Sequence, residues 1–183
     1  MKKKLWIFII CVLIILLLSL LYFLKEKSKN DNSKKNYGTL VEVSYSCSGN
    51  MLGNHYGITL DIENNILSVE NAEINSDPIL QKIYNVTDKN TIEDITNLIN
   101  DLDLPKLSNS EIDENLFVYD ACTPTFGFVY KTGKNSYDKK YYSVSMYYKM
   151  TQIEYDAFYE IKKDLESLEI ENNLISELYK ETD

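Results

Sequence analysis

The sequence contains no arginine: all nineteen basic residues are lysine, and His55 is the one histidine. Without a guanidinium group, the protein cannot form the bidentate hydrogen bonds by which arginine recognises a carboxylate or a phosphate. Cysteine is scarce, with three residues, so the chain has no disulfide-rich framework. The abundance of asparagine, isoleucine and tyrosine beside absent arginine is typical of an AT-rich genome.

Several familiar motifs are also missing. The sequence has no HExxH, no CxxC and no calcium-binding loop, and the glycines at Gly49 and Gly53 lack the lysine and hydroxyl residue of a phosphate-binding loop. The acidic residues near Asp101 and Asp113 do not follow the register of a metal site and are interpreted as a solvated face. The sequence therefore predicts no metal and no cofactor.

Charge is divided unevenly along the chain. Residues 1–36 contain eight lysines and two acidic residues, a formal charge of +6, whereas residues 37–183 contain eleven lysines and twenty-six acidic residues, a formal charge of −15. An acidic domain is repelled by the phosphate backbone, so nucleic acid is excluded as a predicted partner.

A long apolar run follows the N-terminal lysines. Residues 5–24 carry no charged side chain, and twenty helical residues extend about 30 Å, the thickness of the hydrocarbon core of a bilayer. The run ends in bulky residues and not in the small ones that a signal peptidase requires, which favours an uncleaved anchor. We therefore predict a single-pass protein of the cell membrane, with the lipid bilayer as a partner through residues 5–24. Moving the positively charged N-terminal lysines across the membrane against its potential is costly. We therefore expect the N-terminus in the cytoplasm and the C-terminal domain outside the cell.

Beyond the run, residues 25–36 contain no apolar side chain and are predicted to form a charged, flexible linker. Residues 37–183 have the length of one domain. Alternation of apolar and polar residues predicts strands at 39–46, 56–62, 66–70, 125–131 and 141–150, and the ambiguous segment 79–87 is assigned to a further strand. Helical spacing predicts a helix from residue 91 that stops before Pro105, a second helix behind a capping box formed by Thr151 and Glu154, and a short terminal helix at 174–179.

This order of elements predicts an α+β fold. We expect an N-terminal transmembrane helix followed by one domain, with a mostly antiparallel sheet of about five to six strands and two main helices packed on one face. The layout resembles that of small membrane-anchored exported proteins of AT-rich Gram-positive bacteria, a resemblance that rests on the anchor and composition and implies no activity.

Two cysteines lie in the predicted domain, Cys47 and Cys122. They are either joined in a disulfide or present as free buried thiols, and the sequence leaves both possibilities open. Cys47, His55 and Asp120 are also the residue types of a thiol-dependent hydrolase, although no family signature surrounds them. They are the only, and weak, candidates for catalysis.

Tyrosine is concentrated in the last third of the chain, at positions that include 141, 147, 155 and 159. On a strand from residue 141, one face would carry Tyr141, Ser143, Ser145 and Tyr147, a candidate surface for recognising a peptide or a sugar. Ordinary sheet packing explains the same residues. We therefore expect a binding or accessory module at the cell surface, with a protein or the cell wall as its partner, in preference to an enzyme. The alternatives are the thiol hydrolase and a structural subunit of a membrane complex.

Overall fold

The computed structural model describes residues 37–48, 55–72, 79–113, 122–135 and 137–180. Seven strands, two α-helices and one 3₁₀ helix lie in these ranges. In chain order they are β1 Thr39–Ser48, β2 His55–Asp61, β3 Ile66–Ala72, β4 Ile79–Asn85, α2 Lys89–Asp101, η1 Leu104–Asn109, β5 Thr123–Lys131, β6 Lys139–Ser145, α3 Gln152–Glu171 and β7 Asn173–Lys180.

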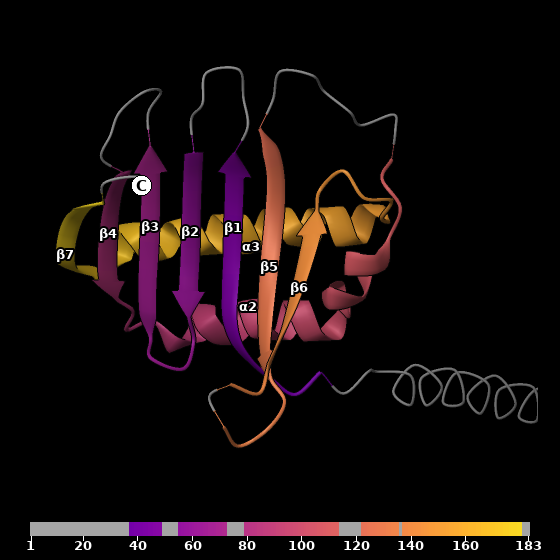
Figure 1. The fold of residues 1–183 in the computed structure, drawn as a ribbon, viewed down its shortest axis with the longest axis horizontal. Coiled ribbons are helices and arrows are strands. Elements are labelled where there is room, and N and C mark those ends of the chain that lie inside the picture. Colours follow the sequence, from indigo (N-terminus) through magenta and orange to yellow (C-terminus); the bar gives the residue numbers. More distant parts are fainter. Residues whose placement is uncertain (1–36, 49–54, 73–78, 114–121, 136, 181–183) are drawn as a thin grey trace, which may run out of the picture. The chain divides into compact units, whose positions relative to one another are not determined.

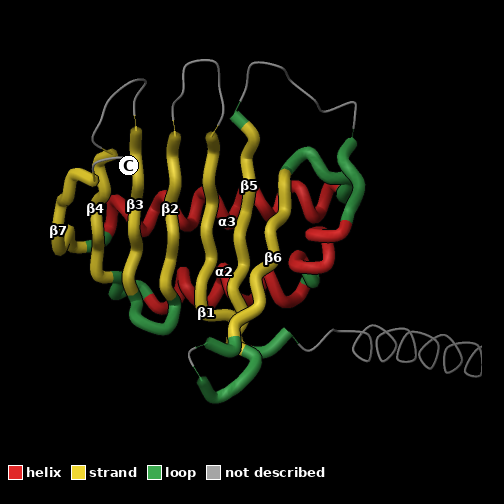
Figure 2. Tube along the Cα trace, in the orientation of Figure 1, coloured by secondary structure: helices red, strands yellow, loops and turns green. Residues whose placement is uncertain are grey.

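All seven strands belong to one antiparallel sheet with the order β6-β5-β1-β2-β3-β4-β7. The first four strands form a meander, β5 pairs with the free side of β1, and β7 pairs with β4 (Figure 1). Both α-helices cover the same face of this sheet, which we call the inner face (Figure 2). The opposite, outer face has no helix packed on it in the described part of the chain.

The inner face forms the core because apolar side chains alternate along the strands and point toward the helices. From the strands, the fully buried members include Val43, Ile58, Leu60, Leu67, Phe126, Phe128 and Val144, and from the helices Ile95, Ile99, Phe158, Ile161, Leu165 and Leu168. The ring of Phe158 lies 4.8 Å from that of Phe126, centroid to centroid, which joins α3 to the centre of the sheet.

Both helices begin at capped ends. The Asp88 side chain accepts hydrogen bonds from the backbone N–H groups of Asn90 and Thr91 at the start of α2. At α3, Glu154 N–H donates to Thr151 Oγ1 at 3.3 Å and Thr151 N–H donates to Glu154 Oε2 at 2.7 Å, so the predicted capping box is confirmed.

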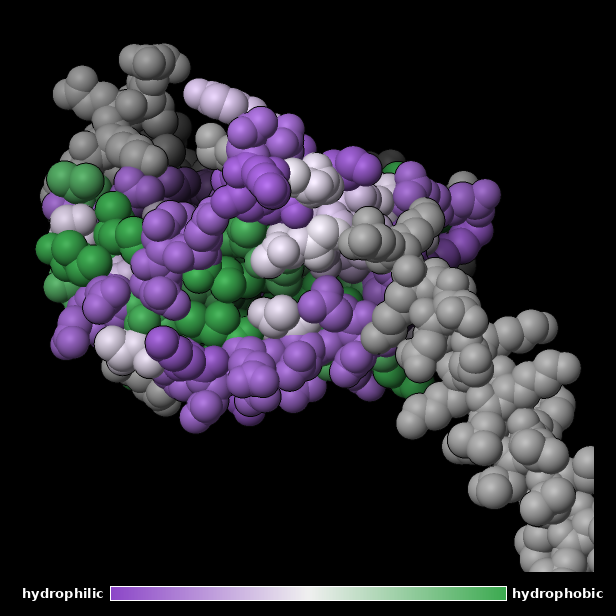
Figure 3. Space-filling model, turned by 90° about the horizontal axis from the view of Figure 1, so that it is seen from below, coloured by the Kyte–Doolittle hydropathy of each residue, from purple (hydrophilic) through white to green (hydrophobic). Residues whose placement is uncertain are grey.

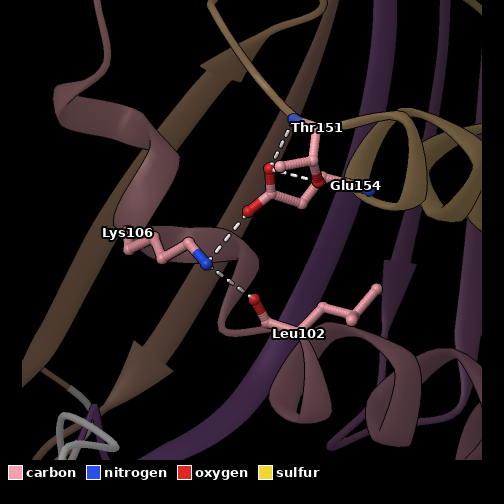
Figure 4. A network of polar contacts seen from close by, with 4 residues as sticks. All are labelled: Leu102, Lys106, Thr151 and Glu154. Atoms are coloured by element: carbon pink, nitrogen blue, oxygen red, sulfur yellow. Dashed lines mark hydrogen bonds and ion pairs between the residues drawn. The ribbon is translucent and has the colours of Figure 1, made fainter.

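The capping box extends into an ion pair that joins η1 to α3. Lys106 Nζ lies 2.9 Å from Glu154 Oε1 and also donates to the carbonyl oxygen of Leu102 (Figure 4). Burial tends to raise the pKa of Glu154, but the hydrogen bonds from Thr151 and the Lys106 ammonium outweigh it and hold the pKa below its usual value. Glu154 therefore stays ionised although its side chain is only 10% exposed.

The predicted fold needs correction in its strands. An α+β domain is present, but its sheet has seven strands and not five to six, because residues 173–180 form β7 and not a short terminal helix. Leu174, Ile175 and Leu178 suit either structure locally, and the pairing with β4 decides between them. The strand predicted over 141–150 is also too long, since β6 ends at Ser145 and a turn follows.

The predicted membrane anchor also needs correction. Within the described ranges of residues 37–180, no helix combines the length and the apolar character needed to cross a bilayer. The helix predicted over residues 5–24 and the linker predicted over 25–36 lie outside the described residues. The structure thus gives no support to a single-pass anchor. The predicted membrane location and the placement of the domain outside the cell have no support from it either.

Candidate functional site: a tyrosine-lined cleft

A cleft of about 300 Å³ lies between the inner face of the sheet and the first half of α3. Four of the side chains that line it are tyrosines, and one is charged. The lining residues are Tyr45, Pro124, Met146, Tyr147, Tyr155, Tyr159 and Lys162. Most of the surface they present is therefore aromatic or apolar, with hydroxyl groups as the main polar atoms.

Three of these residues come from one flank of α3. Tyr155, Tyr159 and Lys162 follow one another at spacings of four and three, which places them on one side of a helix, beside the buried stripe that contains Phe158 and Ile161. The rings of Tyr155 and Tyr159 lie 5.5 Å apart. The helix thus presents a pair of tilted rings in contact and an ammonium group to the cleft.

The opposite wall comes from the sheet and from the turn after β6. Tyr45 points inward from β1 and packs against the ring of Phe126 at 5.1 Å. Met146 and Tyr147 lie just beyond β6, where the Met146 N–H donates to the carbonyl oxygen of Pro124 at 3.0 Å. This backbone bond holds the turn against the start of β5.

A disulfide between Cys47 and Cys122 lies next to this wall, with 5.2 Å between the two Cα atoms. The Tyr147 hydroxyl donates to the carbonyl oxygen of Cys122 at 3.3 Å, and the Tyr147 carbonyl accepts from Asp113 N–H at 2.6 Å. Two residues after Cys122, Pro124 lines the cleft. The bridge therefore ties the segment that carries Pro124, and through it Tyr147, to the end of β1.

The single cation of the cleft is held by its neighbours. Lys162 Nζ lies 5.5 Å from the centre of the Tyr45 ring and 2.6 Å from Glu166 Oε1. Burial raises the pKa of Tyr45, with Lys162 opposing and Glu166 adding to the increase, and burial also raises the pKa of Tyr155. Both hydroxyls are therefore neutral at physiological pH and can donate hydrogen bonds.

The side chains of the cleft offer aromatic surface and hydrogen-bond donors. None of the seven lining side chains is a cysteine, histidine, serine or carboxylate, so the cleft presents none of the usual nucleophiles or general bases other than lysine and tyrosine. In the described ranges, no cluster of three or more histidine, cysteine, aspartate or glutamate residues is arranged to hold a metal ion.

The structure separates the residues of the predicted thiol hydrolase. Cys47 packs against the core on the inner face and lies opposite Tyr56 in the β1–β2 pair. His55, the neighbour of Tyr56, points to the outer face, where a Cβ atom added at Gly57 would lie 3.3 Å from His55 Nε2. Cys47 is also bonded to Cys122, and Asp120 lies outside the described residues. The sheet therefore stands between the two side chains that would have to meet.

The predicted tyrosine and serine surface is also divided. Tyr141 is 73% exposed and, like Ser143, belongs to the outer face of β6, whereas Ser145 is half-buried at the end of the strand. Tyr147 lies in the following turn, where its N–H donates to Ser145 Oγ and its ring lines the cleft. Of the four residues, only Tyr147 belongs to the candidate site.

Sequence reasoning did not single out Tyr45, Pro124, Met146 or Lys162 for this site. The concentration of tyrosines that includes positions 147, 155 and 159 is the one signal that pointed toward it. No protein-family model and no curated protein matches this chain.

Proposed function

We propose that this protein is a binding module whose cleft receives an apolar, preferably aromatic, side chain of a partner protein. The observation that supports this proposal is the convergence of four tyrosines and one methionine on a small cleft that contains a single ammonium group. Tyrosine and methionine are the residue types enriched where proteins recognise one another.

The size of the cleft favours a side chain over a larger ligand. Pockets that enclose whole small molecules measure roughly 300–1,000 Å³, and this cleft lies at the lower end of that range. One aromatic side chain and a neighbouring group of the partner fit in such a space, since a cavity of about 150 Å³ holds a benzene ring, while the remainder of the partner rests on the surrounding surface. Ring pairs contribute about 0.5–1.5 kcal/mol beyond the effect of burial, which favours an aromatic occupant over an aliphatic one.

Lys162 supplies the polar contact that orients such an occupant. One of its three N–H groups is directed to Glu166, and the other two are donors for a backbone carbonyl of the partner. The Tyr45 hydroxyl offers a further donor beside it. A sugar could also stack on these rings, so a sugar is the competing ligand that an experiment has to exclude.

The proposal is tested with the full-length chain labelled with 3-fluorotyrosine and observed by fluorine NMR. The probes are N-acetyl-phenylalanine N-methylamide, the corresponding alanine compound and N-acetylglucosamine. We expect the phenylalanine probe to shift the resonances of Tyr155 and Tyr159 in a saturable way and the other two probes to have no such effect. A response to the sugar alone, or an equal response to the alanine compound, contradicts the proposal.

Two variants test whether the phenylalanine probe binds in the cleft. Tyr155→Ala removes one wall and should weaken binding of the phenylalanine probe at least fivefold. Tyr137→Ala is the matched control, because Tyr137 is 94% exposed and does not line the cleft. If both variants bind the probe like the wild type, the cleft is not the binding site.

A further inference from the structure

A second surface lies at the far end of α3 from the cleft, along β7. This strand is the last of the sheet on its side and pairs with β4 alone. The backbone N–H and C=O groups on its other side therefore have no strand beside them within the described part of the chain. Such an edge is a template on which a further strand can form hydrogen bonds.

The edge is also apolar. Leu174, Ile175 and Leu178 of β7 are 49%, 59% and 51% exposed, and Ile170 at the end of α3 is 85% exposed. Figure 3 shows apolar side chains gathered at the side of the molecule on which Figure 1 places β4 and β7. Four of the nine large apolar side chains that the described structure exposes thus lie within nine positions of one another.

The opposite edge of the sheet serves as an internal comparison. There β6 begins with Lys139 and Lys140, and the chain beyond it forms a bridge between Tyr148 and Ile112. Lysines on an edge strand and a covering segment are features that prevent pairing with another chain. β7 has no proline, and its one lysine is Lys180 at the last position, so it lacks the protection that β6 has.

The charge around β7 indicates which segment would pair with it. Between Asp164 and Asp183 the chain carries seven acidic residues and one lysine. The C-terminus of α3 adds the negative end of its dipole, and no basic residue lies in its last turn. Lys82 stands opposite Glu177 across the β4–β7 pair and Lys162 pairs with Glu166, so two of these charges are offset and the segment remains acidic. A basic segment is therefore attracted to this edge, and a second copy of the same acidic edge is repelled.

We propose that β7 is a strand-addition site for an extended segment of a partner protein in which apolar residues alternate with lysine or arginine. The backbone of the segment continues the sheet beyond β7. Its apolar side chains lie on the outer face of the sheet beside Leu178, which is paired with Gln81, and its cations lie on the inner face beside Glu177 and the acidic end of α3. This interaction is independent of the tyrosine-lined cleft and uses none of its residues.

The test titrates the full-length chain with the peptide acetyl-KVKVKVK-amide and follows backbone amides by NMR. We expect hydrogen exchange of β7 amides to slow by at least tenfold at saturation. Two control peptides isolate the cause: one has the same side chains with alternate residues N-methylated, and the other is acetyl-EVEVEVE-amide. Each should bind at least tenfold more weakly, because the first cannot form the ladder of hydrogen bonds and the second carries the wrong charge.

Two variants locate the interaction. Leu178→Lys places a cation on the edge and should weaken binding of acetyl-KVKVKVK-amide at least tenfold. Ile153→Lys is the matched control, because Ile153 is equally apolar and is 68% exposed at the other end of α3. Because both side chains are at least half exposed, neither variant removes a core contact.

Several results would overturn the proposal. These are equal binding of the N-methylated peptide, equal binding of the glutamate peptide, unchanged exchange of the β7 amides, and self-association of the protein that Leu178→Lys abolishes in sedimentation. The proposals for the cleft and for β7 can be refuted independently. Leu178→Lys should leave the response of the cleft to the phenylalanine probe unchanged, and Tyr155→Ala should leave peptide binding at β7 unchanged.

Discussion

Removal of the disulfide is the perturbation whose size follows most directly from the structure. Cys47 is the last residue of β1 on the inner face, and Cys122 comes directly before β5. The strand β5 pairs with β1 along its length. The two cysteines are 75 positions apart. Cys122→Ser opens this covalent loop and leaves the β1–β5 backbone pairing in place.

The expected loss comes mainly from the unfolded chain, which gains conformational freedom when the loop is opened. For a loop of 75 residues, the chain-entropy relation gives about 4.5 kcal/mol at 25 °C. This is a large part of the roughly 5–15 kcal/mol by which single domains are stable. With a denaturant slope of about 2 kcal/mol/M in urea, the midpoint of unfolding should fall by about 2 M.

The measurement is urea unfolding of the full-length chain, followed by circular dichroism. Cys11→Ser is the matched control, since it removes a thiol that takes no part in the bridge. The wild type with reductant should unfold like Cys122→Ser, and the variant should not respond to reductant. A loss below about 1 kcal/mol, the size of an ordinary substitution, would refute the idea that the bridge constrains the unfolded chain.

Two further substitutions test the core and the capping box. Phe158→Ala deletes a fully buried ring that packs on Phe126 and should lower the free energy of unfolding by about 3–5 kcal/mol in urea; a loss under about 1 kcal/mol would contradict the assigned packing. Glu154→Gln removes the carboxylate that Lys106 and the cap hold ionised, at a cost of about 1 kcal/mol at neutral pH. Because the pKa of Glu154 is lower in the folded than in the unfolded chain, the wild type has this stabilisation above about pH 4.5 and loses it as the pH falls further. Stability measured between pH 3 and 7 should therefore converge for the two proteins in acid, and parallel curves would show that the carboxylate is not stabilised by folding.

Local patterns in the sequence predicted the two main helices well, but not the end of the chain, where a helix expected at 174–179 is the strand β7. The capping box of Thr151 and Glu154 marks the start of α3, and the apolar residues that follow at helical spacing, Phe158, Ile161, Leu165 and Leu168, are fully buried. Ile153, in the first turn of α3, is apolar but 68% exposed. The helix expected to stop before Pro105 ends at Asp101, and the proline instead lies within η1, near its start.

Predictions failed where a segment takes its structure from a distant partner. Residues 173–180 are a strand because β4 offers an edge. The chain after Ser145 leaves the sheet through a turn closed by Tyr148 N–H and the Ser145 carbonyl oxygen, and this turn leads into the bridge between Tyr148 and Ile112. The candidate site could not be assembled from spacing at all. Tyr45 and Tyr155 are 110 positions apart, and only the packing of α3 on β1 brings them together.

The sequence by itself determined the features that depend on near neighbours: the helical stripes, the capped start of α3, the alternation along the strands and the acidic character of residues 37–183. Only the tertiary structure decided that Cys47 bonds to Cys122 and that Cys47 and His55 lie on opposite faces of the sheet. It also decided that β7 occupies an unprotected edge. The physical reason is that hydrogen-bond pairing between strands joins residues of any separation, whereas the periodicity of side chains along a strand or helix is local.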